Sequence, residues 1–105
     1  MKLTHKDYIT ILEYYGITIP TNKKGNVDRK QIKIEAEKIL ASKLCRCIKK
    51  VNPNDESESI SLCTNSIFTK RGLSYSAFKC SPAFMLHKTK RNKPALNKTR
   101  KKITF

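Results

Sequence analysis

Hydrophobic residues recur at helical spacing in three stretches of the chain, and each stretch predicts one helix. Thr4 and Asp7 precede the first stretch with the spacing of a capping box, and Gly16 follows it where a left-handed C-terminal cap belongs. The apolar positions between them follow the i, i+3, i+4, i+7 order of a helix with one buried face: Tyr8, Ile11, Leu12 and Tyr15.

The second stretch is the longest and has the strongest helical pattern. Asp28 can cap its start, and Pro53 lies in the segment that stops it. Its apolar residues fall mostly three or four positions apart, at Ile32, Ala36, Ile39, Leu40, Leu44, Cys47, Ile48 and Val51. The opposite, largely basic side carries Arg29, Lys30, Lys33, Glu37, Lys38, Arg46 and Lys49.

A third helix is predicted from Ile60, Cys63, Ile67 and Phe68, and Gly72 ends it. Residues 73–80 alternate weakly and predict at most one short strand. The fold class that follows is mainly α, a small three-helix domain over residues 1–86. Residues 87–105 show almost no apolar period and predict a basic flexible tail that orders on a partner.

Positive charge dominates the composition and is unevenly distributed. The net charge is +15 over 105 residues, and residues 59–105 carry 11 Lys and Arg but no Asp or Glu. A lysine-rich genome would also enrich Lys, but the asymmetry favours a nucleic acid partner. Backbone contacts should dominate and sequence specificity should be weak, because we see no aromatic residues interleaved with basic ones. The predicted phosphate-binding residues are Lys70, Arg71, Lys79, Lys88, Lys90, Arg91, Lys93, Lys98, Arg100, Lys101 and Lys102.

The role of the four cysteines has three possible interpretations. Cys45, Cys47, Cys63 and Cys80 could close one structural zinc site, with His5 or His87 replacing one of them. They could instead form one or two disulfides, or pack as reduced core residues. Side chains at i and i+2 of an α-helix point about 200° apart, so Cys45 and Cys47 cannot share a metal within a regular helix. The hypothesis of a zinc site therefore requires that the helix end or distort near Leu44.

We expect no enzymatic activity and no catalytic residues. His5 and His87 lie near opposite ends of the chain, and paired carboxylates and Gly-rich phosphate loops are absent from the sequence. No apolar run is long enough to span a membrane, and residues 1–10 lack the apolar core of a secretory signal. These features predict a protein of the cytoplasm or nucleus that is not secreted, where cysteines are normally reduced.

Three segments within about residues 3–80 carry a resemblance: "LTHKDYITILEYYGITIP", "AEKILASKLCRCIKKV" and "SISLCTNSIFTKRGLSYSAFKC", with K-L-C-R-C the most specific block. They resemble a largely uncharacterised group of small basic four-cysteine proteins of nucleocytoplasmic large DNA viruses. The resemblance marks the four cysteines as family positions. It implies DNA more than RNA as the partner and a viral factory or virion as the location, and it strengthens the disulfide interpretation because many such viruses encode thiol oxidases.

Two functions are compatible with this sequence. The first is a viral DNA-associated protein that acts in genome packaging, condensation or transcription. The second is a structural or assembly protein of the virion whose basic tail binds an acidic protein surface. No membrane partner is expected in either case.

Overall fold

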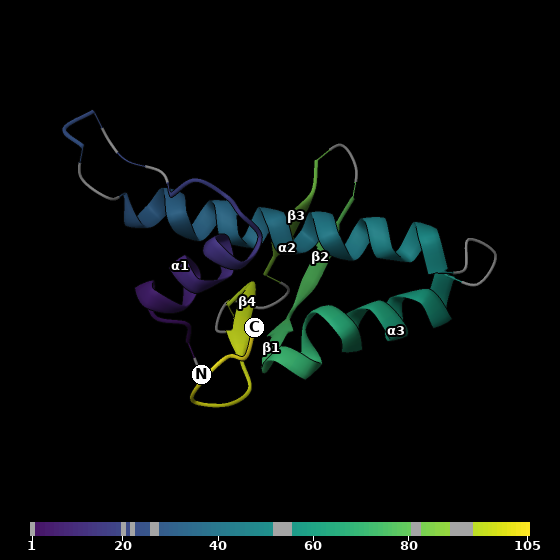
Figure 1. Cartoon of the computed structure of the whole chain (residues 1–105). Helices are drawn as coiled ribbons and strands as arrows, with labels where there is room; N and C mark the ends of the chain where they lie inside the picture. The colour runs from purple at the N-terminus through teal and green to yellow at the C-terminus, as the bar shows by residue number, and fades with distance from the viewer. Residues whose placement is uncertain are drawn as a thin grey trace.

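One long helix, α2 (Arg29–Val51), organises the fold, as Figure 1 shows. In this computed structural model, which describes residues 2–19, 21, 23–25, 28–51, 56–80, 83–88 and 94–105, α1 (His5–Tyr14) packs on the N-terminal half of α2. Helix α3 (Glu56–Ile67) packs on its C-terminal half. At 1.5 Å per residue α2 is about 34 Å long, so it runs along most of the 48 Å long axis of the molecule.

The predicted ends of α1 and the predicted start of α2 are confirmed, whereas α3 ends at Ile67 and not at Gly72, and Pro53 lies outside the described residues. Thr4 and Asp7 form a capping box, in which the Asp7 N–H donates to Thr4 Oγ1 at 3.2 Å and the Thr4 N–H donates to Asp7 Oδ2 at 2.9 Å. Gly16 follows α1 with a φ of 69°, in the left-handed region. Asp28 Oδ1 accepts hydrogen bonds from the N–H groups of Lys30 and Gln31, at 3.1 and 3.2 Å. Local sequence signals therefore fix where α1 and α2 begin.

The predicted apolar stripes form the core. Ile11 and Leu12 of α1 are fully buried, and so are Cys63 of α3 and Phe68 just after it. Helix α2 contributes residues from each part of its stripe: Ile32, Ala36, Leu40, Leu44 and Ile48. Val51, at the end of the stripe, is instead 46% exposed. Burial of these side chains from three helices supplies the main hydrophobic stabilisation.

The prediction of a mainly α domain with at most one short strand is wrong. A 3₁₀ turn, η1 (Thr69–Arg71), is capped by Gly72 with φ 80°, and the residues described after it form four strands. They are β1 (Leu73–Tyr75), β2 (Ala77–Lys79), β3 (Met85–His87) and β4 (Leu96–Lys98). Two antiparallel pairs result, β1 with β4 and β2 with β3, so three helices share the fold with two small sheets.

A break at Ser76 explains why the strands of this region could not be predicted from the sequence. Residues 73–79 run almost continuously as a strand, but Ser76 interrupts it, and each half pairs with a different partner. At the break, Ser76 donates from its N–H to the Ala95 carbonyl at 3.1 Å and from Oγ to the Pro94 carbonyl at 2.9 Å. Strands of three residues are too short for an alternating pattern to be recognised, and their partners lie in segments without apolar periodicity.

Residues 94–105 pack against the domain, whereas a flexible tail was expected from residue 87 onward. Leu73 pairs with Lys98 in the β1–β4 register, and Leu96 and Ile103 are buried. The Thr99 N–H donates to the Gly72 carbonyl at 2.8 Å, and the Thr104 N–H donates to the Arg71 carbonyl at 3.0 Å. A few well-placed apolar residues and backbone hydrogen bonds anchor this basic segment.

The predicted zinc site is also wrong, because the cysteines form two disulfides. Cys45 is bonded to Cys80 and Cys47 to Cys63, which leaves no free cysteine. Among the described residues, no group of three or more His, Cys, Asp or Glu side chains could hold a metal ion. Helix α2 continues to Val51, so Cys45 and Cys47 point to different sides of a regular helix and reach different partners. One bond ties α2 to the end of β2 and the other ties it to α3.

Candidate functional site

The predicted phosphate-binding residues do not have a common environment. Lys90, Arg91 and Lys93 lie outside the described residues. Six others are exposed: Lys70, Lys79, Lys88, Arg100, Lys101 and Lys102. Arg71 is half-buried and Lys98 is buried. Several of these side chains stabilise the fold, as their contacts show.

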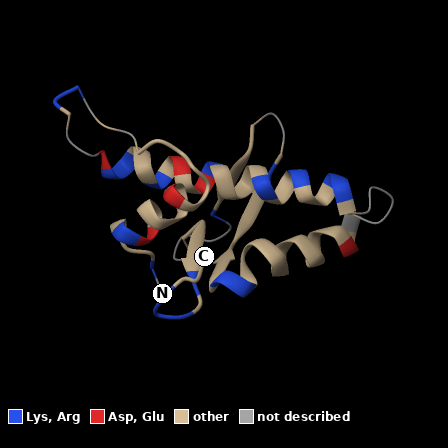
Figure 2. Ribbon diagram, in the orientation of Figure 1, with Lys and Arg blue, Asp and Glu red and all other residues tan. Residues whose placement is uncertain are grey.

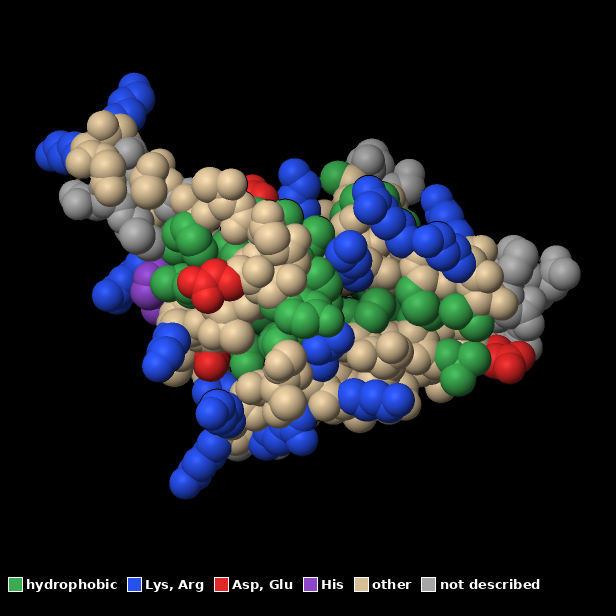
Figure 3. All heavy atoms as spheres, viewed as in Figure 1, with side chains coloured by type: hydrophobic (Ala, Val, Ile, Leu, Met, Phe, Trp, Pro, Cys, Tyr) green, Lys and Arg blue, Asp and Glu red, His purple; other side chains and the backbone are tan. Residues whose placement is uncertain are grey.

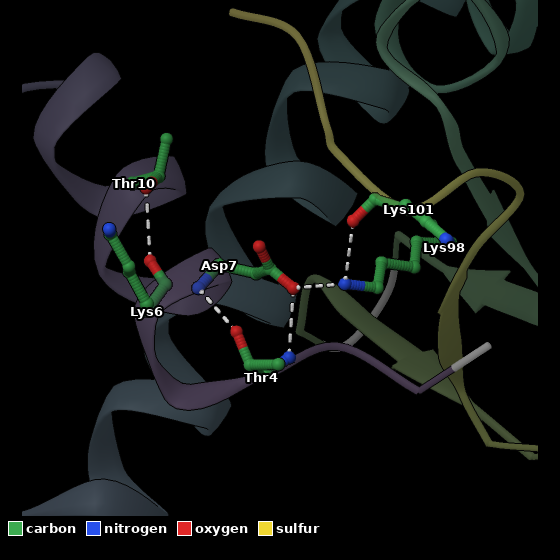
Figure 4. A network of polar contacts seen from close by, with 6 residues as sticks. All are labelled: Thr4, Lys6, Asp7, Thr10, Lys98 and Lys101. Atoms are coloured by element: carbon green, nitrogen blue, oxygen red, sulfur yellow. Dashed lines mark hydrogen bonds and ion pairs between the residues drawn. The ribbon is translucent and has the colours of Figure 1, made fainter.

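Lys98 connects the two ends of the described chain. Its Nζ lies 2.9 Å from Asp7 Oδ2 and donates to the Lys101 carbonyl at 3.0 Å (Figure 4). Burial raises the pKa of Asp7, but the hydrogen bonds from Lys98 and Thr4 outweigh it and hold that pKa below its usual value. Lys98 therefore pairs with a carboxylate inside the protein and anchors β4 to α1.

Two arginines secure the C-terminal segment in a similar way. Arg100 donates from Nη2 to the Lys70 carbonyl at 2.8 Å, and its side chain lies against Gly72, where any Cβ would come within 2.5 Å of Nε. The Arg71 guanidinium lies 4.6 Å from the ring centres of both Tyr14 and Phe105. Cation–π contacts of this kind stabilise the packing of α1 against the last residues of the chain.

A basic cleft of about 650 Å³ lies where α1, the start of α2 and the C-terminal segment meet. Five cationic side chains from three segments line it: Lys2 before α1, Arg29, Lys30 and Lys33 on α2, and Lys88 after β3. His5 and Tyr8 of α1 complete the wall, with Leu3, Pro94 and Leu96 as apolar lining. No Asp or Glu is among the described lining residues. Such a concavity is chemically suited to phosphate or another polyanion.

Local sequence signals place the walls of this cleft. Leu3 and Tyr8 flank the Thr4 cap at the N′ and N4 positions, where apolar residues typically pack on each other as a hydrophobic staple and fix how the chain enters a helix. On α2, Ile32 is fully buried, so the neighbouring Lys30 and Lys33 lie on the exposed side of the first two turns. The cap of each helix therefore orients the side chains beside it.

Glu37 and Tyr8 set the electrostatics behind the cleft. Burial raises the pKa of Glu37, and the nearby positive charges of Lys33 and Lys88 oppose that rise. Burial, with smaller contributions from Glu37 and Asp7, raises the pKa of Tyr8 to about 12. The Tyr8 phenol is therefore neutral at any physiological pH, and a carboxylate lies near two of the five cations.

A second basic region covers the C-terminal half of α2. Figure 2 shows Lys and Arg without acidic residues along this part of the helix, and Figure 3 shows their side chains gathered over it on the visible face. Arg46, Lys49 and Lys50 are exposed there. Positive charge in the last turn of a helix is favoured by the helix dipole, so these lysines have a structural explanation.

Of the five cations that line the cleft, Lys88 is the one predicted from the sequence as a phosphate contact. The other four were not predicted. A signal existed for Arg29, Lys30 and Lys33, because cations in the first two turns of a helix oppose the usual preference for acids. No sequence signal linked them to Lys2, which comes within reach through tertiary packing alone.

Comparison with protein-family models, curated sequences and solved structures finds no significant match to this chain. Within the described ranges, no helix is both long enough and apolar enough to cross a membrane. Function must therefore be inferred from the residues of this chain.

Proposed function

We propose that this domain binds nucleic acid without catalysing a reaction, and that the basic cleft holds the phosphate backbone. The observation that carries the proposal is the convergence of five cations from three segments on one concavity. Phosphates bound there would displace counterions, which drives association and weakens it as the salt concentration rises. The net charge of +15 would attract a polyanion from a distance.

DNA is the nucleic acid to test first, because of the resemblance to proteins of large nucleocytoplasmic DNA viruses. We propose genome packaging, condensation or transcription as the setting. The two disulfides are compatible with that origin, since such viruses commonly encode thiol oxidases.

Virion assembly through an acidic protein partner is the competing function. That hypothesis relied on a free basic tail. Leu96–Lys98 instead pair with β1, and Leu96 and Ile103 are buried, which removes much of the proposed tail. Virion assembly is therefore the second candidate, and the experiment below distinguishes it from nucleic acid binding.

The test compares two double variants of the same helix by fluorescence anisotropy, with a labelled duplex DNA oligonucleotide over a range of salt. Lys30→Ala/Lys33→Ala removes two cleft charges, and Lys49→Ala/Lys50→Ala removes two exposed charges at the other end of α2. The cleft variant should weaken binding about tenfold or more and lower the slope of log K against log salt by about 1.8. The control variant Lys49→Ala/Lys50→Ala should retain most of the DNA affinity and most of the salt dependence.

Equal losses in the two variants would contradict a site in the cleft and indicate diffuse attraction by net charge. Absence of DNA binding at low salt would contradict the proposed function altogether. Binding to an acidic protein in that case would support the assembly function.

A further inference from the structure

The cleft has a chemical feature that phosphate binding leaves unexplained. Beside its cations it presents Tyr8 and the apolar residues Leu3, Pro94 and Leu96. Contacts to a phosphate backbone need cations and hydrogen-bond donors, and an apolar wall contributes nothing to them. A basic groove combined with an aromatic ring is instead typical of proteins that bind single-stranded nucleic acid, where bases stack on the ring.

Shape gives an independent argument for a single strand. Duplex DNA presents its phosphates on a convex surface and keeps its bases stacked inside, so it could touch the rim of a concavity without filling it. A volume of about 650 Å³ lies within the range of small-ligand pockets, roughly 300–1,000 Å³. A nucleotide whose base is unstacked could enter such a space.

The position of Tyr8 suits a base. Its side chain is half-buried at the staple position of α1, so ordering the ring on binding costs little further entropy. Glu37 lies close enough to interact electrostatically with Tyr8, and a carboxylate there disfavours a phosphate beside the ring. The phosphates would then lie toward Lys2, Arg29 and Lys30, and the base would lie toward Tyr8.

We propose that the cleft takes a single-stranded segment of nucleic acid, with phosphates on its cationic rim and one base against Tyr8. This inference rests on the proposed function and makes it more specific, since it names the strand state and the contact that recognises it.

The experiment uses the oxidised full chain and three labelled ligands of equal length. They are a single-stranded oligothymidylate, a strand of abasic sites with the same phosphates, and a duplex. Stacking of one base predicts that oligothymidylate binds roughly 5- to 150-fold tighter than the abasic strand. The duplex should bind less tightly than oligothymidylate at the same salt concentration.

Variants of Tyr8 locate the base. Tyr8→Leu should remove the difference between oligothymidylate and the abasic strand, and Tyr8→Phe should keep it. Tyr14→Leu is the matched control, because Tyr14 lies on the same helix outside the lining of the cleft. The comparison of ligands on the unmodified protein needs no variant, so a folding defect in Tyr8→Leu leaves the inference testable.

Equal affinity for oligothymidylate and the abasic strand would overturn the inference, as would tighter binding of the duplex. If both strands then still lost affinity in Lys30→Ala/Lys33→Ala, the proposed backbone-binding function would stand alone. If that variant bound every ligand normally, the proposed function would fail as well.

Discussion

The two ends of α2 carry similar positive charge in different structural settings. At the N-terminal end, Arg29, Lys30 and Lys33 face a cleft, and the start of the helix is held by the side chain of Asp28. At the C-terminal end, basic side chains surround two cysteines that bond α2 covalently to its neighbours. Charge at the C-terminal end agrees with the helix dipole, whereas charge at the N-terminal end opposes it. Net charge alone therefore does not locate the proposed site, which we infer from unfavourable charge placement together with the cleft.

Removal of the disulfides should have the largest effect on stability. The chain-entropy model gives about 4 kcal/mol for the longer loop, so Cys45→Ala/Cys80→Ala should lower the free energy of unfolding by that amount. The shorter loop of Cys47 and Cys63 gives about 3 kcal/mol. Urea unfolding of both double variants measures these losses.

Measuring the oligonucleotide affinity of a disulfide variant tests whether its effect is confined to stability. Cys47→Ala/Cys63→Ala alters the end of α2 away from the cleft, so the folded variant should bind nucleic acid as the unmodified protein does. A large loss of affinity would show that the two ends of α2 are coupled.

Asp7 should have the next largest effect, because its ion pair with Lys98 anchors the cleft end of α1. Asp7→Asn should lower the free energy of unfolding by about 2 kcal/mol at pH 7. The folded pKa of Asp7 is below its ordinary value, so its stabilisation is present above about pH 4 and is lost as the pH falls through the folded pKa. Thermal unfolding between pH 7 and pH 2 should show the two proteins converging in acid.

Glu13→Gln is the matched control for Asp7, since it removes one exposed acid from the same helix. A constant difference between Asp7→Asn and the unmodified protein at every pH would contradict the role of the Asp7 charge.

The cap of α2 should have the smallest effect. Asp28→Ala removes the acceptor for the N–H groups of Lys30 and Gln31 and should cost about 1 kcal/mol, measured by urea unfolding. Asp28→Asn keeps a capping oxygen and should cost a few tenths of that amount. Both variants remove a negative charge beside Arg29, so DNA affinity at low salt should rise in the Asn variant. A fall in its affinity would mean that Asp28 helps to position the cations.

The helices could be predicted from the sequence because their signals are local. Thr4, Asp7 and Gly16 mark the ends of α1 within a dozen residues, and the spacing of buried residues in α2 is regular. The pairing of β1 with β4 could not be predicted, because it joins Leu73 to Lys98 across segments with no recognisable period. The predictable part of the fold is therefore the part in which neighbours in sequence are neighbours in space.

The candidate site also has a part that the sequence predicts and a part that it does not. The basic outer face of α2 was visible in the sequence, but the approach of Lys2 and Lys88 to it depends on long-range packing. For the cysteines, the opposite directions of Cys45 and Cys47 argued against a shared metal. The expected reducing compartment favoured metal or buried thiols over disulfides, and the choice between those readings needed the positions of α3 and β2.

The spacing of Cys45 and Cys47 also constrains the order of events during synthesis. Cys63 leaves the ribosome before Cys80, so for a time two thiols on α2 can compete for one partner. Once α2 is helical, Cys47 faces α3 and Cys45 points away from it. A helix of this length forms in about a microsecond, whereas disulfides take seconds or longer, so secondary structure precedes oxidation. The direction of each side chain then favours the native bonds, because Cys47 faces Cys63 on α3 and Cys45 faces Cys80 at the end of β2.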